Sequence, residues 1–257
     1  MASHDKIRLM SALPLYLLFD LDDTLLDYSA SGRRCWQELF LEYAPRFGVT
    51  VEQFASAHQQ TSDWYWSDLE RHRTGRLDLK TARRQVLKRT MEKLGLQAQT
   101  LGDEMADAFT LRREEMFAPF PGAIEILQEF QRRGIRMGLV TNGNGEFQRK
   151  KIRRFDLTRY FETVIIEGEF GVGKPDQSVF TAALEQLGAL PVQAWMVGDD
   201  LARDIQPAQA LGMGTVWVDI ENGGLPAGSP ITPMRIVHSV SELCRASLTA
   251  FPHSNPG

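Results

Sequence analysis

The segment Leu15–Thr24 constrains the fold of this chain more than any other stretch. It joins five consecutive apolar residues directly to a cluster of three aspartates and a threonine. A short apolar run of this kind is typical of a strand that is buried on both faces of a parallel sheet. Open α/β sheets bind ligands at the carboxyl ends of such strands, which is where the acids fall. The segment therefore predicts a central strand whose end belongs to a functional site.

Asp20 and Asp22 lie two positions apart, so their side chains share one face of an extended chain. Carboxylates this close repel each other unless a cation lies between them. Oxygen ligands of this kind suit a hard divalent metal, and Mg²⁺ is the preferred interpretation. An acidic turn that follows a strand without binding metal remains the alternative as long as this segment is considered alone.

Three later apolar runs end in polar residues of matching chemistry. They are Arg136–Val140 before Thr141-Asn142-Gly143, Thr163–Ile166 before Gly171-Val172-Gly173-Lys174-Pro175, and Ala194–Val197 before Gly198-Asp199-Asp200 and Asp204. The order Asp-x-Asp-x-Thr, Thr-Asn, Lys-Pro and Gly-Asp-Asp-x-x-x-Asp resembles the four motifs of the haloacid dehalogenase (HAD) superfamily, over about Leu15 to Val218. Members are mostly phosphatases with a Rossmann-like core, a metal ion and an aspartate nucleophile, and the resemblance implies the same here.

From Gly122 onward, amphipathic helices alternate with short apolar strands. Alternating βα units predict an α/β fold with a parallel sheet and right-handed crossovers. The resemblance implies a Rossmann-like sheet with strand order 5-4-1-2-3 and the strand before Asp20 at its centre. Ile236-Val237 is expected to add an edge strand, and Ser239–Leu248 a last helix.

Strand signals are missing between Asp27 and Arg136. This region instead carries apolar residues at helical spacing in four stretches: Ser31–Phe47, Val51–Leu69, Leu79–Leu94 and Leu101–Met116. An all-helical insertion directly after the first catalytic strand resembles the C1 cap of the superfamily. The expected domains are a core of residues 13–27 and 117–257 and a helical cap of residues 28–116. Such a cap implies a substrate small enough to be enclosed.

Composition narrows the class of protein. The chain of 257 residues has a net charge of −4, so it lacks the basic footprint of a protein that binds a nucleic-acid polymer. No apolar run approaches the ~18 residues that a membrane helix requires. Cys35 and Cys244 are too few for a disulfide framework and lack metal-ligand spacing. These features favour a cytoplasmic enzyme, and they leave the oligomeric state open.

The resemblance also implies roles for individual residues. Asp20 is the expected nucleophile, which forms an aspartyl-phosphate, and Asp22 is the expected general acid and then general base. The Mg²⁺ ion would bind Asp20, the backbone carbonyl of Asp22, and Asp199. Haloacid dehalogenases proper lack the second aspartate, because halide leaves without a proton. The presence of Asp22 therefore favours phosphate esters over carbon–halogen bonds.

Further residues are expected to hold the phosphate group. The Thr141 hydroxyl and the Asn142 backbone N–H would bind a phosphate oxygen, and Lys174 would lie over the phosphate and Asp20 as a point charge. Asp204 and Asp200 are expected in the second layer, where Asp204 would orient Lys174 or a metal-bound water. The alternative for Asp204 is an acid that complements the dipole of a helix N-terminus.

The cap sequence is less specific. It contains the aromatic cluster Trp64-Tyr65-Trp66, with His58 and Arg71-His72-Arg73 nearby, and these residues could contact the part of the substrate away from the phosphate. Consecutive helical residues point in different directions, so helix packing is the favoured role of Trp64 and Trp66. Arg33 and Arg34 are candidates for a second anionic group, although such arginines are usually solvated.

The combined interpretation is a Mg²⁺-dependent phosphatase of a small phosphorylated metabolite, such as a nucleotide, a sugar phosphate or a phosphoglycolate-like ester. The chain looks most like the branch that contains pyrimidine 5′-nucleotidases and N-acylneuraminate-9-phosphate phosphatase, with phosphoglycolate phosphatase nearby. A sugar phosphomutase of the same superfamily shares every core residue and remains an alternative.

Two non-enzymatic alternatives are weaker. A phospho-receiver domain groups similar residues around an aspartate, but in another order and without a helical insertion of about 90 residues. A catalytically silent HAD module that only binds is disfavoured because all catalytic positions are filled.

Overall fold

The computed structural model describes residues 13–245, and residues 1–12 and 246–257 lie outside this description. The chain forms two compact units. The core unit comprises the residues up to Leu26, Pro119–Thr141 and the residues from Gln148 onward, and the cap unit comprises Asp27–Ala118 and Asn142–Phe147. The expected boundaries placed the stretch Asn142–Phe147 in the core. It groups with the cap unit because the Asn144 side chain donates to the Leu77 carbonyl and Phe147 packs edge-on against Phe117.

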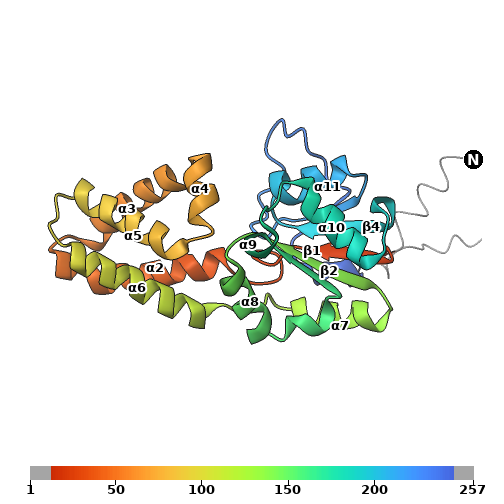
Figure 1. Ribbon diagram of the computed structural model, residues 1–257. Helices are drawn as coiled ribbons and strands as arrows, with labels where there is room; N and C mark the ends of the chain where they lie inside the picture. The colour runs from red at the N-terminus through yellow and green to blue at the C-terminus, as the bar shows by residue number, and fades with distance from the viewer. Residues whose placement is uncertain (1–12, 246–257) are drawn as a thin grey trace, which may run out of the picture. The chain divides into compact units, whose positions relative to one another are not determined.

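The core unit is built on one six-stranded parallel sheet in the order β3-β2-β1-β4-β5-β6. Strands β1, β2 and β4 of this sheet are labelled in Figure 1. The strands are β1 (Tyr16–Phe19), β2 (Arg136–Thr141), β3 (Thr163–Ile166), β4 (Ala194–Gly198), β5 (Gly214–Val218) and β6 (Arg235–Val237). The α/β fold class and the order 5-4-1-2-3 are confirmed, with the expected edge strand as the sixth member. Leu15 lies outside β1 and is exposed.

Helices cover both faces of this sheet. Leu17 and Phe19 of β1 point to the face that packs on α7 (Ala123–Arg132), α8 (Gly145–Arg154) and α12 (Glu242–Arg245). Leu18 points to the opposite face, which packs on α10 (Gln177–Leu187) and α11 (Gln206–Ala210). Because successive strand residues alternate between faces, β1 needs apolar residues at every position. The expected last helix begins later than predicted, at Glu242, and its part beyond Arg245 lies outside the described residues.

The cap unit contains five α-helices in its Asp27–Ala118 segment, with a 3₁₀ turn at Pro45–Phe47. They are α2 (Ser29–Tyr43), α3 (Val51–Trp66), α4 (Leu69–Gly75), α5 (Leu79–Lys93) and α6 (Gln99–Met116). The expectation of four helices was wrong, because it extended the second helix through Leu69. The Asp68 side chain instead accepts a hydrogen bond from the Arg71 N–H at 2.8 Å and caps a separate helix, α4.

The interior of the cap unit is aromatic. Trp36 stacks on Phe109 with ring centroids 4.0 Å apart, and the His58 ring lies 4.4 Å from the Trp36 ring. His58 is buried, and its Nε2 atom has no hydrogen-bond partner. Burial lowers the pKa of His58 to about 4, so the ring is neutral at neutral pH.

No helix within residues 13–245 is both long enough and apolar enough to cross a membrane.

Candidate active site

Strand register brings the ends of three strands to one edge of the sheet. Phe19 of β1 lies beside Leu139 of β2 and Val197 of β4. The Asp20 N–H then donates to the Val197 carbonyl at 2.9 Å, which extends the pairing by one residue. Since the strands are parallel, the polar residues that follow all three leave the sheet on the same side.

The chain turns back immediately after Asp22. Asp23 has a φ of 60°, a left-handed conformation that aspartate tolerates better than most residues, and its N–H donates to the Leu26 carbonyl at 2.8 Å. The turn places the Thr24 hydroxyl 3.3 Å from Asp199 Oδ1 and 3.5 Å from Asp20 Oδ2. Thr24 therefore lies between the first and last acidic motifs.

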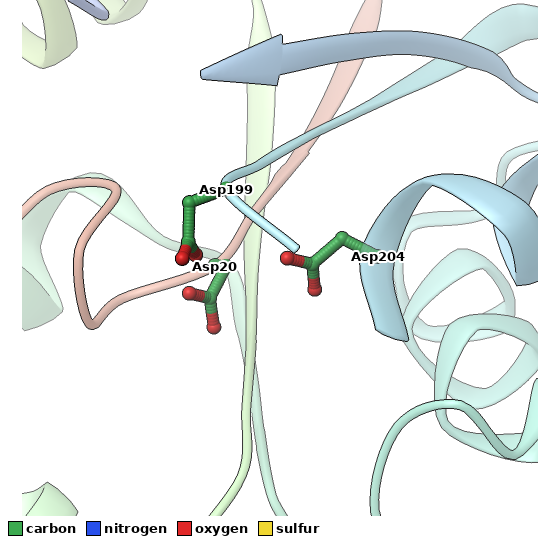
Figure 2. A group of neighbouring side chains, drawn as sticks. All are labelled: Asp20, Asp199 and Asp204. Carbon is green, nitrogen blue, oxygen red and sulfur yellow. The ribbon is translucent and has the colours of Figure 1, made fainter. Parts of the chain in front are cut away.

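Three carboxylates from distant motifs converge at this edge. One oxygen each from Asp20, Asp199 and Asp204 lies within 4.8 Å of the others, and Figure 2 shows the three side chains grouped beyond the strand ends. Burial raises the pKa of Asp199 well above its usual value, and the nearby charges of Asp20 and Asp204 raise it further against the opposing effect of Lys174. Crowded hard oxygen donors of this kind fit a divalent cation such as Mg²⁺, which would relieve the repulsion.

Lys174 places a positively charged side chain next to two of these carboxylates. Its Nζ atom lies 2.5 Å from Asp20 Oδ1 and 2.6 Å from Asp204 Oδ1, and its side chain is almost completely buried. Burial lowers the pKa of Lys174, but the two carboxylates outweigh it and hold the pKa above the usual value. The group is therefore a fixed positive charge beside Asp20.

Asp204 is held from two sides. Its Oδ1 faces Lys174, and its Oδ2 accepts a hydrogen bond from the Asp200 N–H at 3.0 Å. Burial raises the pKa of Asp204 to about 6, partly opposed by Lys174. A Cβ atom at Gly198 would collide with the Asp204 carboxylate, so the glycine of this motif makes room for the acid.

The Asp200 carboxylate caps the helical turn that directly follows it. It caps the short π-helical turn η4 (Leu201–Ile205) by accepting from the N–H groups of Ala202 and Arg203 at 2.9 and 2.8 Å. It also pairs with the Arg203 guanidinium at 2.7 Å. Burial opposes ionisation of Asp200, but Arg203 holds its pKa below the usual value.

Asp22 has partners that the sequence analysis missed. The Lys151 Nζ atom lies 2.7 and 2.6 Å from its two oxygens, and Gln148 Nε2 donates to Oδ2 at 3.0 Å. Both residues lie on α8, spaced three apart on the same buried face as Ile152. A lysine and a glutamine on the apolar face of an amphipathic helix are unusual, and this pattern was the available signal.

Thr141 ends β2 and is buried, and its hydroxyl accepts a hydrogen bond from Gln148 Nε2 at 2.7 Å. Asn142 follows directly, is partly buried, and belongs to the stretch that groups with the cap unit. The structure thus places Thr141 and Asp22 around one glutamine amide.

The three residues of the aromatic cluster in the cap unit differ in how exposed they are. Tyr65 is buried and Trp66 partly buried, whereas Trp64 is 40% exposed. The Arg71 and Arg89 guanidinium carbons each lie 4.0 Å from the Trp64 ring, and Trp64 borders a groove of about 470 Å³ between α3 and α5. The two arginines near the start of α2 are exposed: Arg33, and Arg34, which pairs with Asp27 at 2.8 Å.

Residues 16–212 match the family model of the haloacid dehalogenase-like hydrolases. The chain therefore belongs to this family of enzymes, in agreement with the motif order and the Rossmann-like sheet.

Curated relatives place it among the phosphatases of the family. The chain is 34% identical over 220 residues to phosphoserine phosphatase of Thermus thermophilus, covering 79% of this chain and 88% of the relative. It is 30% identical over 230 residues to pyrimidine 5′-nucleotidase of Escherichia coli, covering 89% and 95%. The HAD-hydrolase YfnB of Bacillus subtilis has the same fold, with a TM-score of 0.69 at 22% identity over 90% of this chain and 97% of that one.

Proposed function

We propose that this protein is a Mg²⁺-dependent phosphatase that hydrolyses a small phosphate monoester through an aspartyl-phosphate on Asp20. The observation that carries the proposal is the position of Asp20. Its carboxylate stands at the carboxyl end of the central strand, with Lys174 2.5 Å from one oxygen and Asp199 among its neighbours. An anionic nucleophile that attacks an anionic phosphate needs positive charge beside it, which Lys174 supplies and a cation held by Asp20 and Asp199 would add.

The first half-reaction transfers the phosphoryl group. An oxygen of Asp20 attacks phosphorus as the bond from phosphorus to the ester oxygen breaks, and protonated Asp22 gives its proton to the departing alkoxide. Lys174 and the Thr141 hydroxyl hold the oxygens of the transferring group, together with the Asn142 N–H. Bound Mg²⁺, held by Asp20, Asp199 and the Asp22 carbonyl, would supply charge neutralisation on the phosphate oxygens.

The second half-reaction releases inorganic phosphate. Asp22, now a carboxylate, accepts a proton from a water molecule that attacks the phosphorus of the aspartyl-phosphate. The bond between phosphorus and the Asp20 oxygen breaks, which restores the Asp20 carboxylate. Asp204 holds Lys174 in place throughout, since it binds the ammonium at 2.6 Å.

The names of the relatives support the proposed substrate class. The phosphoserine phosphatase and the pyrimidine nucleotidase to which the chain is similar are named for small phosphorylated metabolites. We infer that the substrate is a small, soluble phosphorylated metabolite and that the protein is located in the cytoplasm. A sugar phosphomutase would use the same core residues but would return the phosphoryl group to a sugar rather than to water.

Turnover of p-nitrophenyl phosphate with Mg²⁺, and again with EDTA, tests the proposal. We expect steady release of phosphate that stops with EDTA and returns when Mg²⁺ is added in excess. Asp20→Asn is the matched control, because it removes the nucleophile with almost no change of size. Activity that persists in Asp20→Asn, with deamidation excluded by mass spectrometry, would overturn the covalent mechanism.

A screen of phosphorylated metabolites ranked by kcat/KM then identifies the substrate. Release of inorganic phosphate supports a phosphatase, whereas transfer between two positions of a sugar without net phosphate release supports a mutase.

A further inference from the structure

Helix α8 carries two polar side chains that meet Asp22. The Lys151 side chain is 2% exposed and Gln148 is 1% exposed, so both are deeply buried for residues of their kind. Burying a lysine ammonium costs free energy unless a carboxylate compensates it. The Asp22 carboxylate lies within ion-pair distance of the Lys151 ammonium, at 2.6 Å. The Asp22 carboxylate therefore compensates the buried charge of Lys151 within the core unit.

The geometry fixes both oxygens of Asp22. Lys151 binds Oδ1 at 2.7 Å and Oδ2 at 2.6 Å, and Gln148 adds a hydrogen bond to Oδ2 at 3.0 Å. A carboxylate offers about four lone-pair positions, two on each oxygen. Three are engaged by α8, and the remaining position lies on Oδ1. The three hydrogen bonds therefore determine which oxygen atom is open toward a substrate or a water molecule.

Gln148 also connects this carboxylate to the phosphate-binding residue of the second motif. Its Nε2 atom donates to Thr141 Oγ1 at 2.7 Å as well as to Asp22. An amide nitrogen has two hydrogens, so one group can make both bonds. The amide thereby sets the separation between the hydroxyl that holds the phosphate and the carboxylate that exchanges a proton with the leaving group or water.

We propose that Lys151 and Gln148 are positioning residues that orient Asp22 relative to Thr141, so that Asp22 exchanges its proton through Oδ1. This inference rests on the phosphatase function proposed above. In the proposed mechanism neither residue contacts the substrate or exchanges a proton itself, and both act through the Asp22 carboxylate that they bind. Because a displacement of about 1 Å can cost 10²-fold in rate, loss of either contact should lower kcat more than it changes KM.

A double-mutant cycle on Lys151 and Asp22 tests the inference. The variants are Lys151→Met, Asp22→Asn and the double variant, assayed for kcat with an activated aryl phosphate, whose phenolate leaves without general-acid help. Lys151→Met should lower kcat about 10–100-fold in the wild-type background. In the Asp22→Asn background it should have no further effect, because the group that it orients is already gone.

Two controls separate orientation from folding. Lys150→Met makes the same change at the neighbouring, exposed position of α8 and should leave kcat within about twofold of wild type. Far-ultraviolet circular dichroism and thermal melts give the folded fraction of each variant, to which kcat is normalised. If Lys151→Met does not fold, the same cycle is run with Gln148→Met, which keeps the length of the side chain and removes the amide.

The outcomes distinguish this inference from the function itself. Losses in kcat that multiply in the double variant would overturn the positioning role, as would an unchanged kcat in folded Lys151→Met. Recovery of part of the rate when methylammonium is added to Lys151→Ala would support it, because a purely structural lysine would not respond in kcat. Failure of the wild-type enzyme to turn over any phosphate ester would instead overturn the phosphatase assignment.

Discussion

Lys174 and Asp204 form an ion pair of 2.6 Å in which both side chains are almost completely buried. Because Lys174 also binds Asp20 at 2.5 Å, the Asp204 carboxylate controls the position of the charge beside the proposed nucleophile. The presence of two carboxylates beside Lys174 also affects the stability of the fold. Two negative groups compensate one buried ammonium, so the three residues depend on one another for stability.

Lys174→Met should destabilise the core unit by about 3–5 kcal/mol, the usual cost of removing one partner from a buried ion pair. Urea unfolding followed by tryptophan fluorescence measures the change, with Lys150→Met at an exposed position as the matched control. Adding Asp204→Asn to Lys174→Met should recover part of the loss, because it removes one uncompensated charge. A free energy of unfolding that does not change in Lys174→Met would contradict the dependence.

Gly198→Ala should disturb the same group without changing any charge. The added methyl would collide with the Asp204 carboxylate, which must then move away from the Asp200 N–H or from Lys174. We expect a loss of about 1–3 kcal/mol in unfolding free energy together with a lower kcat. Gly223→Ala is the control, because an added Cβ there meets no atom within 4 Å. Equal stability of the two variants would show that the end of β4 adjusts freely.

Most of the fold was predictable from the sequence because the central strands are short and almost completely buried. The runs before Asp20, Thr141 and Asp199 are apolar at nearly every position, and only strands covered on both faces need this pattern. The break between α3 and α4 was missed, since it depends on the Asp68 cap rather than on apolar spacing.

The site was predictable where its residues belong to motifs and not elsewhere. Asp20, Lys174 and Asp204 are recognisable from motif order, and the structure brings them within ion-pair distance. Lys151 lies 129 positions from Asp22, and no local pattern indicates which acid a buried lysine meets. Partners of this kind follow from how α8 packs on the sheet, which is a tertiary property.

His58→Phe should make the protein more stable and less sensitive to acid. The pKa of His58 is about 4 in the folded chain and near 6.5 when unfolded, so the unfolded state binds the proton first as the pH falls. Stability is therefore full above pH 6.5 and declines toward pH 4, by about 3 kcal/mol for this group. Phenylalanine removes both this proton linkage and the unpartnered Nε2 atom.

Chemical denaturation of wild type and His58→Phe at several pH values between 4 and 7.5 measures this difference. The advantage of the variant should grow as the pH falls. His72→Phe, at a partly exposed histidine of α4, is the matched control. Parallel pH curves for wild type and His58→Phe would show that His58 is not the group responsible.

Asp199→Ala should raise the Mg²⁺ concentration needed for half-maximal activity by at least about tenfold, with a smaller effect on kcat at saturating metal. Its carboxylate lies in the acidic group with Asp20 and Asp204, where an oxygen ligand would be lost. Without added metal, the variant should melt at a higher temperature than wild type, because a buried, repelled charge is removed. Asp63→Ala, at an exposed aspartate within α3, is the control for loss of a carboxylate away from the acidic group. An unchanged Mg²⁺ titration would show that Asp199 is not a ligand.

The substitution Asp22→Asn separates the two chemical roles of Asp22. A poor alkoxide leaving group needs a proton in the transition state, and such help is typically worth ~10²–10⁴ in rate. An activated phenolate departs without it, so phosphorylation of Asp20 should survive with p-nitrophenyl phosphate and fall steeply with an alkyl phosphate. Loss of the base for the second step should make the aspartyl-phosphate accumulate, giving a burst of p-nitrophenol followed by slow turnover.

Stopped-flow measurement of p-nitrophenol release shows the burst directly. The variant also leaves the Lys151 ammonium without its carboxylate, so thermal melts must accompany the kinetics and should show a lower melting temperature. The double variant Asp22→Asn with Lys151→Met removes that charge and should recover the melting temperature while keeping the burst. Equal losses for good and poor leaving groups in folded Asp22→Asn, without a burst, would mean that Asp22 shapes the metal site and does not transfer the proton.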